Sequence, residues 1–217
     1  MIRISKTSKL GCLSWSLQAV ETCPGAVAAD GGLVEVCRGC YATQGNYRFA
    51  NVKAPRAENK EDWKREGWVK DMVAALQGQT HFRWFDSGDC YSLQLAEKIK
   101  AVIEQTPTVK HWMPTRMHKF SKFQGTLQAI QSLPNAVVRY SGDDVVTDSY
   151  DAPADGFHSA VIADPSVKVS KDVTVCEAYS RDGKCGSCRA CWSKDVPAIA
   201  YPAHGKAMSK VIRIKAI

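Results

Sequence analysis

The sequence predicts an α/β fold on parallel strands, arranged as an incomplete barrel or a strongly curved sheet. Apolar strand-like segments alternate with amphipathic helical segments between residues 59 and 164, as in successive βαβ units. Polar clusters follow several of these strands, and parallel α/β folds place their ligand sites at the carboxyl ends of strands. Hydrophobic residues make up 45% of the chain and charged residues 24%, which excludes a disordered or collagen-like chain.

Hydrophobic periodicity assigns the elements in chain order. Residues 1–50 are rich in Gly and Cys and are predicted to be irregular. Helices are predicted over 58–76, 92–105 and 123–133, with Ser92 as the N-cap of the second. Strands are predicted over 81–89, 109–117, 136–144, 157–164, 173–179 and 198–205. The Lys-rich segment 206–215 alternates cationic and apolar side chains, which predicts an edge strand with its Lys side chains in solvent.

We expect one α/β domain over residues 1–217, because this length can bury a core and no low-complexity linker interrupts it. It comprises a Cys-rich N-terminal segment (1–57), a βα core (58–175), and a Cys-rich loop with a C-terminal strand (176–217). The chain has neither a signal-peptide pattern nor a run of about 18 apolar residues. A cytoplasmic protein without a membrane partner is therefore expected; nothing in the sequence predicts an oligomeric state.

The strongest motif is a group of four cysteines near the C-terminus, Cys176, Cys185, Cys188 and Cys191. In a reducing compartment, clustered Cys are more often metal ligands than disulfides. The last three are spaced C-x2-C-x2-C on a loop containing Gly183 and Gly186, a spacing typical of a [4Fe–4S] cluster whose fourth ligand lies elsewhere. Tetrahedral zinc is the main alternative, and buried structural thiols are the other.

A second, weaker group consists of Cys23, Cys37 and Cys40, with Cys12 as a candidate fourth member. Three thiolates would leave one iron of a cluster open to a small molecule. Alternatively, Cys23 is a lone buried thiol, or a single site draws ligands from both groups. We interpret these cysteines as a second cluster or a zinc site.

Polar residues at the strand ends are the candidate cofactor-binding residues. The set is Asp86, Ser87, Asp89, Thr115, Arg116, Arg139, Ser141 and Asp143. Successive parallel strands end on the same side of a sheet, so we expect these side chains to line one polar cavity. Because buried charges need partners, they either pair with one another or bind a zwitterionic small molecule.

Partners are weakly specified by the sequence. The net charge of +7 is explained by a solvated Lys-rich surface or by an anionic partner such as nucleic acid. Neither a P-loop nor a G-x-G-x-x-G motif is present, so nothing indicates a nucleoside triphosphate or a dinucleotide.

Several motifs together resemble a family of bacteriophage proteins, the gene-product-88-like family. They are CPGA (23–26), CRGCYATQGNY (37–47), FRWFDSGD (82–89), HWMPTRM (111–117), VRYSGDD (138–144) and CGSCRACW (185–192). The resemblance spans about residues 5 to 205 and implies location in the cytoplasm of an infected host. The family is similar to radical S-adenosylmethionine (SAM) enzymes, which implies a partial (β/α) barrel holding an iron–sulfur cluster.

The sequence departs from radical SAM enzymes at their cluster loop, C-x3-C-x2-C, because Cys23 lies far before Cys37. Ser87-Gly88-Asp89 also stands where those enzymes have Gly-Gly-Glu. The resemblance therefore implies a phage [4Fe–4S] protein with a radical-SAM-like barrel that lacks standard SAM-cleaving chemistry. The alternative is a radical SAM-type enzyme using Cys23, Cys37 and Cys40. A second alternative is a zinc-binding or nucleic-acid-associated accessory protein.

Overall fold

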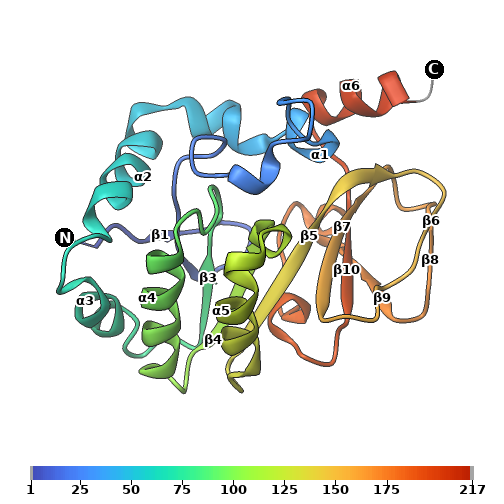
Figure 1. Ribbon diagram of the computed structural model, residues 1–217. Helices are drawn as coiled ribbons and strands as arrows, with labels where there is room; N and C mark the ends of the chain where they lie inside the picture. Colours follow the sequence, from blue (N-terminus) through green and yellow to red (C-terminus); the bar gives the residue numbers. More distant parts are fainter. Residues whose placement is uncertain (1, 216–217) are drawn as a thin grey trace.

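The computed structural model describes residues 2–215 and shows a mixed α/β fold around one large sheet (Figure 1). The strands are β1 (Ser5–Lys6), β2 (Leu13–Trp15), β3 (His81–Trp84), β4 (Lys110–Thr115), β5 (Ala136–Val146), β6 (Ser149–Tyr150), β7 (Phe157–Ile162), β8 (Lys168–Val169), β9 (Val173–Val175) and β10 (Ala198–Pro202). The helices are α1 (Glu35–Arg38), α2 (Ala50–Asp62), α3 (Trp68–Ala75), α4 (Leu93–Glu104), α5 (Ser121–Ser132) and α6 (Lys206–Lys215). Short 3₁₀ helices cover Pro24–Ala26, Tyr41–Thr43, Gly45–Arg48, Met117–Lys119, Ala178–Arg181 and Ala190–Trp192.

The main sheet has eight strands in the order β1-β2-β3-β4-β5-β7-β10-β9. Strand β1 pairs antiparallel with β2, and the other neighbouring strands pair in parallel. Strands β1 and β9 lie at opposite edges, so the sheet is open and does not close into a barrel. Strands β6 and β8 form a separate two-stranded parallel sheet. The structure thus confirms the predicted parallel α/β class in the form of an open sheet.

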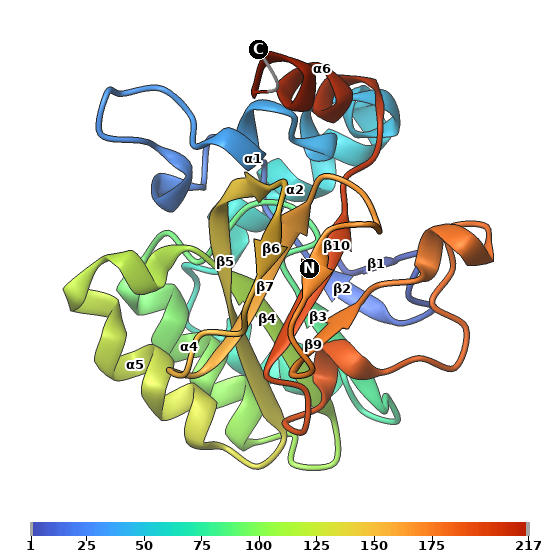
Figure 2. The ribbon, with the colours of Figure 1, turned by 90° about the vertical axis from the view of Figure 1, so that its right-hand side faces the viewer.

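Helices α4 and α5 cover one face of this sheet, and α3 packs beside α4 (Figures 1 and 2). The apolar faces predicted for these helices are buried in one core together with Trp15, Trp84 and Met113. Successive strand residues point to opposite faces, so Met113 contributes to this core while Trp112 points to the other side.

The opposite face of the sheet is covered by the Cys-rich segment that follows β9, coloured orange in Figure 2. Trp112 on β4 packs there against Trp192 and Leu10. The indole N–H of Trp192 donates a hydrogen bond to the carbonyl of Phe82 at 2.8 Å, which fixes the segment to β3. This segment therefore occupies the side of the sheet that the helices leave open.

Several predicted elements differ from the structure. The predicted helix 58–76 is two helices, α2 and α3, separated by a break at 63–67. The predicted edge strand 206–215 is the helix α6, so that prediction was wrong. Its alternating pattern is equally compatible with helical spacing, since Met208, Val211 and Ile212 pack together against Val34 and Val36. Among the described residues, no helix is long and apolar enough to cross a bilayer.

The N-terminal segment is less irregular than predicted, because β2 joins the main sheet beside β3. Strand β5 is longer than predicted. It continues to Val146 and does not end at the Ser141-Gly142-Asp143 turn. Its pairing with β7 shifts register between Ser141 and Val145, so these polar residues form a bulge within the strand. No helix separates β5 from β7 in the described chain, and the regular βαβ alternation stops there.

Candidate functional site

A cavity of about 660 Å³ lies at the carboxyl ends of the central strands. We call it the strand-end cavity. The predicted residues that line it are Asp86, Ser87, Asp89, Thr115, Arg116 and Ser141, with Cys23, Cys37, Cys40, Cys176, Cys185 and Cys191. The parallel topology thus brings the strand ends and cysteines from both groups to one place. Arg139, Asp143 and Cys188 are absent from the described lining residues.

Asp86, just after β3, is held by a set of surrounding donors. Its carboxylate accepts hydrogen bonds from the Tyr47 hydroxyl and from Arg83 at 3.0 Å. Arg56 forms an ion pair with it at 3.6 Å and donates a hydrogen bond to Ser87 Oγ at 2.6 Å. Ser87 in turn donates to the carbonyl of Leu17 at 2.7 Å. These contacts connect α2 to the end of β3.

Asp89 ties the end of β3 to the end of β4. One carboxylate oxygen accepts hydrogen bonds from Thr115 Oγ1 at 2.6 Å and from the Cys90 N–H at 2.7 Å. The other accepts one from the Arg116 N–H at 2.8 Å. Burial nevertheless raises the pKa of this carboxyl above its ordinary value. Both oxygens of Asp89 are thus already used in joining the two strand ends.

Arg116 is likewise paired within the protein. Its Nε lies 3.2 Å from a carboxylate oxygen of Asp143, and its Nη2 donates to the carbonyl of Gly142 at 2.7 Å. Lys119 forms a second ion pair with Asp143. The Asp143 carboxylate is therefore neutralised by two cations beside the cavity.

Arg139 has a different role from the predicted one. Its side chain is fully buried and points to the Cys-rich face of the sheet. It donates to the carbonyls of Cys191, Val196, Pro197, Ala190 and Ser193 at 3.0 to 3.5 Å. Carbonyl dipoles thus replace water around this charge. We reinterpret Arg139 as the residue that positions the loop carrying Cys191.

Three glycines bring the N-terminal cysteines to the strand ends by close packing. A Cβ on Gly25 would lie 2.6 Å from Cβ of Arg116, and one on Gly88 would lie 2.6 Å from Cβ of Leu17. A Cβ on Gly39 would lie 2.9 Å from Cα of Met208 on α6. Gly88 also has a φ of +76°, which disfavours a side chain. Without side chains at these positions, the segments carrying Cys23 and Cys37–Cys40 can approach β4, β3 and α6.

The thiols of Cys23, Cys37 and Cys40 share one environment. Burial raises the pKa of Cys23 to about 12, and nearby Asp89 adds to this. Burial also raises the pKa values of Cys37 and Cys40, although Arg116 opposes the shift in both. Backbone N–H groups of Ala42 and Thr43 act in the same lowering direction on the pKa of Cys40. Arg116 and the N–H donors favour thiolates, the form that binds metals, but burial outweighs them and favours the protonated thiols.

The C-terminal cysteines form a second group, next to the cluster that contains Trp112 and Trp192. Cys185 is buried there, and Cys176 and Cys191 pack against the same apolar cluster. Cys12 packs on this cluster too, so the structure places it with the C-terminal group instead of the N-terminal one. The Sγ of Cys191 lies 3.3 Å from the Tyr201 hydroxyl.

All nine cysteines are free thiols. Among residues 2–215, no group of three or more His, Cys, Asp or Glu side chains is arranged to hold a metal ion. The donor chemistry still fits a thiolate-bound metal, since the N-terminal group supplies three thiols and the C-terminal group four. Gly183 and Gly186 have φ values of +73° and +57°, so the C-terminal loop turns sharply between its cysteines.

Several residues that line the cavity were not predicted from the sequence. They are Tyr41, Tyr47, Arg56, Arg83 and Tyr201. Arg83 stacks over Trp112 at 4.6 Å and pairs with Asp86. Its position between buried Phe82 and Trp84 in β3 was a usable signal, because alternation directs it to the opposite face. Tyr41 and Tyr47 belong to the motif CRGCYATQGNY (37–47), which could have indicated them, whereas Tyr201 and Arg56 belong to none of the quoted motifs.

One protein-family model, described as Gene product 88, matches residues 2–194. The match agrees with the family indicated by the sequence motifs and does not extend to radical SAM enzymes. No curated protein and no solved structure matches the chain.

Proposed function

This chain belongs to the gene product 88 family, and we propose that it is an iron–sulfur protein. In this proposal Cys176, Cys185, Cys188 and Cys191 hold a [4Fe–4S] cluster, and the strand-end cavity gives a small molecule access to the site. An iron–sulfur cluster would supply electron-transfer chemistry at this face of the sheet.

The observation that carries the proposal is the contrast between the polar side chains and the thiols of the cavity. Asp86, Ser87, Asp89 and Arg116 are engaged with other protein groups. Six cysteines from the two groups, in contrast, line the same space without forming disulfides, and only Cys191 among them has a polar side-chain contact described above, with the Tyr201 hydroxyl. The thiols are therefore the groups best placed to bind something the chain itself does not supply.

Binding would require the C-terminal thiols to turn toward one another. Metal binding commonly completes a site that is not formed in its absence. The anchoring of this loop by Arg139 and Trp192 supports the proposal, because it keeps Cys191 near β5 while the glycine-rich turn adjusts. Trp192 also shields this side from solvent, which influences the reduction potential of a cluster.

Serine substitution tests the ligand assignment. We expect Cys188→Ser to abolish the visible absorbance of anaerobically purified protein and to lower its stability. Cys90→Ser is the matched control, since Cys90 is buried outside both groups and its Sγ donates to the Ser92 carbonyl. If the purified protein contained stoichiometric zinc and no sulfide, these cysteines would be assigned to a zinc site and not to a cluster. Unchanged absorbance in Cys188→Ser would contradict the assignment.

A second candidate is a three-thiol cluster on Cys23, Cys37 and Cys40, in a radical SAM-type enzyme. The favouring observation is that Cys23, Cys37 and Cys40 all line the cavity and that the charge of Arg116 acts on Cys37 and Cys40 in the direction that favours thiolates. Against SAM binding, both oxygens of Asp89 already accept hydrogen bonds, so the Ser-Gly-Asp turn presents no free carboxylate to an amine. Loss of iron in Cys40→Ser but not in Cys188→Ser, with reductive cleavage of SAM, would establish this candidate instead.

A further inference from the structure

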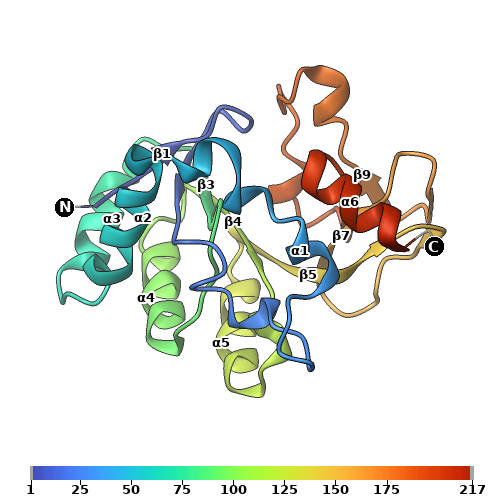
Figure 3. The ribbon, with the colours of Figure 1, turned by 90° about the horizontal axis from the view of Figure 1, so that it is seen from above.

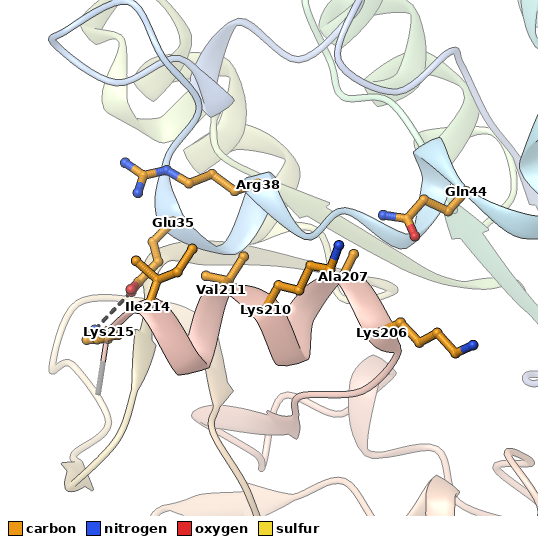
Figure 4. Close-up of a pocket in the computed structure, with 9 residues that line it drawn as sticks. All are labelled: Glu35, Arg38, Gln44, Lys206, Ala207, Lys210, Val211, Ile214 and Lys215. Atoms are coloured by element: carbon orange, nitrogen blue, oxygen red, sulfur yellow. Dashed lines mark hydrogen bonds and ion pairs between the residues drawn. The ribbon is translucent and has the colours of Figure 1, made fainter. Parts of the chain in front are cut away.

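A second pocket, separate from the strand-end cavity, lies between α1 and α6 (Figure 4). Its volume is about 630 Å³. Helices α1 and α6 lie side by side above the strand ends (Figures 1 and 3). The pocket is lined by Glu35, Arg38, Gln44, Lys206, Ala207, Lys210, Val211, Ile214 and Lys215. We call it the α1/α6 groove.

The charge of the groove is strongly positive. Helix α6 carries four cations and no acidic residue over 206–215. The one carboxylate lining the groove, Glu35, already accepts hydrogen bonds from Lys215 at 2.9 Å and from the Val145 N–H at 2.7 Å. Lys206 and Lys210 form no ion pair within the described chain. Arg38 donates from Nε to the Leu33 carbonyl at 3.0 Å, and its charge acts on Glu35, whose pKa it helps to lower. The groove therefore has two lysines without an anionic partner beside an arginine that shares Glu35 with Lys215.

The position of Lys206 adds to this imbalance. It is the first residue of α6, and the first turn of this helix contains no acidic side chain. The N-terminus of a helix carries partial positive charge and is stabilised by anions, so a lysine there is unfavourable. An anionic partner near this end would relieve the repulsion.

Apolar side chains separate the cations. Ala207, Val211 and Ile214 lie at helical spacing on the groove side of α6, as Figure 4 shows. Ile214 is 73% exposed, which leaves a large apolar side chain in solvent. Single-stranded nucleic acid is bound by cations combined with aromatic stacking platforms, and no aromatic residue lines this groove. Apolar positions flanked by charge instead match an amphipathic helix laid in a groove.

We propose that the α1/α6 groove binds an acidic amphipathic segment of a partner protein. Its apolar side chains cover Val211 and Ile214, and its carboxylates pair with Lys206, Lys210 and Arg38. The proposal concerns a surface distinct from the cysteines and holds whether or not the chain binds a cluster.

A labelled synthetic helix tests this in fluorescence anisotropy with the full chain. The probe has about 18 residues, or about five turns, with Leu at i, i+3, i+4 and i+7 and Glu at the flanking positions. We expect saturable binding at low salt. The double variant Lys206→Glu/Lys210→Glu should weaken it about tenfold or more, and Val211→Ser about fivefold. Lys171→Glu, a charge reversal at an exposed position outside the groove, should leave binding unchanged.

Three outcomes would overturn the proposal. The first is no saturable binding of the acidic peptide. The second is equal weakening by Lys171→Glu, which would indicate general attraction to a basic protein. The third is tighter binding of an oligo-dT strand through the same lysines with no effect of Val211→Ser, which would identify a phosphate site. Amide hydrogen exchange over 206–215 in each variant verifies that α6 remains folded.

Discussion

The guanidinium of Arg139 donates a hydrogen bond from Nε to the carbonyl of Cys191 at 3.1 Å. This contact joins the middle of β5 to the last cysteine of the C-terminal group. With the other carbonyls bound by the same side chain, it fixes the loop 190–197 on the sheet. One buried cation thus organises the segment in which we place the cluster.

Removing this cation should destabilise the protein. In Arg139→Met, five backbone carbonyls lose a charged donor in a buried environment, so we expect a loss of about 3 kcal/mol or more in the free energy of unfolding. Urea denaturation measures it, with the exposed Arg48→Met as the control. If both variants unfolded at the urea concentration of the parent, Arg139 would not have the structural role described.

Adding a side chain at Gly39 should destabilise the protein, because Gly39 packs closely on α6. Gly39→Ala places a Cβ 2.9 Å from Cα of Met208, so backbone must move and α6 should loosen, at a cost of about 1–3 kcal/mol. Gly125→Ala is the matched control, because a Cβ there meets nothing within 4 Å in the middle of α5. It should instead stabilise the protein by about 0.5–1 kcal/mol.

Amide hydrogen exchange of α6 reports the local effect of Gly39→Ala. We expect faster exchange over 206–215 in this variant only. Unchanged exchange of α6 in Gly39→Ala, or equally fast exchange of α6 in Gly125→Ala, would show that the close packing of the Cys37–Cys40 loop on α6 does not hold.

His111 should make stability fall at acidic pH. It is 1% exposed, its Nδ1 accepts from the Trp84 indole at 3.3 Å, and its Nε2 lies 2.9 Å from Thr106 Oγ1. Thr106 donates its own proton to the Val102 carbonyl, so the assigned tautomer is neutral with the proton on Nε2. Burial lowers the pKa of His111 to about 3.

The unfolded chain takes up this proton near pH 6.5, whereas the folded protein resists it down to about pH 3. The contribution of His111 to stability is therefore complete above about pH 6.5. It declines below that by up to about 1.4 kcal/mol per pH unit. Urea denaturation at about pH 7 and pH 5 tests this. His111→Gln should flatten the dependence strongly. His204→Gln should change it much less, because the burial that lowers the pKa of His204 is only partial. Identical dependence in His111→Gln would refute the assignment.

Elements with a distinct hydrophobic period were predictable from the sequence. The apolar residues Leu95, Ile99 and Val102 of α4 are all fully buried, as their spacing indicates. The strand β2 was missed because three residues give too short a pattern. Segment 206–215 was assigned wrongly because its apolar residues fit two periods, and only packing against α1 decides between them.

The candidate site, too, was predictable only in part. Parallel strand topology made it predictable that Asp86, Asp89 and Thr115 would lie together, since their strand ends share one edge. The different roles of Arg116 and Arg139 were not predicted. Arg116 lines the cavity, whereas Arg139 binds backbone carbonyls of the loop 190–197, and the position of that loop depends on long-range packing.

The iron and acid-labile sulfide content of anaerobically purified protein shows whether the C-terminal cysteines hold a [4Fe–4S] cluster. We expect brown protein with iron and sulfide in equal amounts, both lost in Cys188→Ser and retained in Cys90→Ser. Colourless protein that stays free of iron and sulfide after anaerobic reconstitution, or that holds zinc without sulfide, would contradict it.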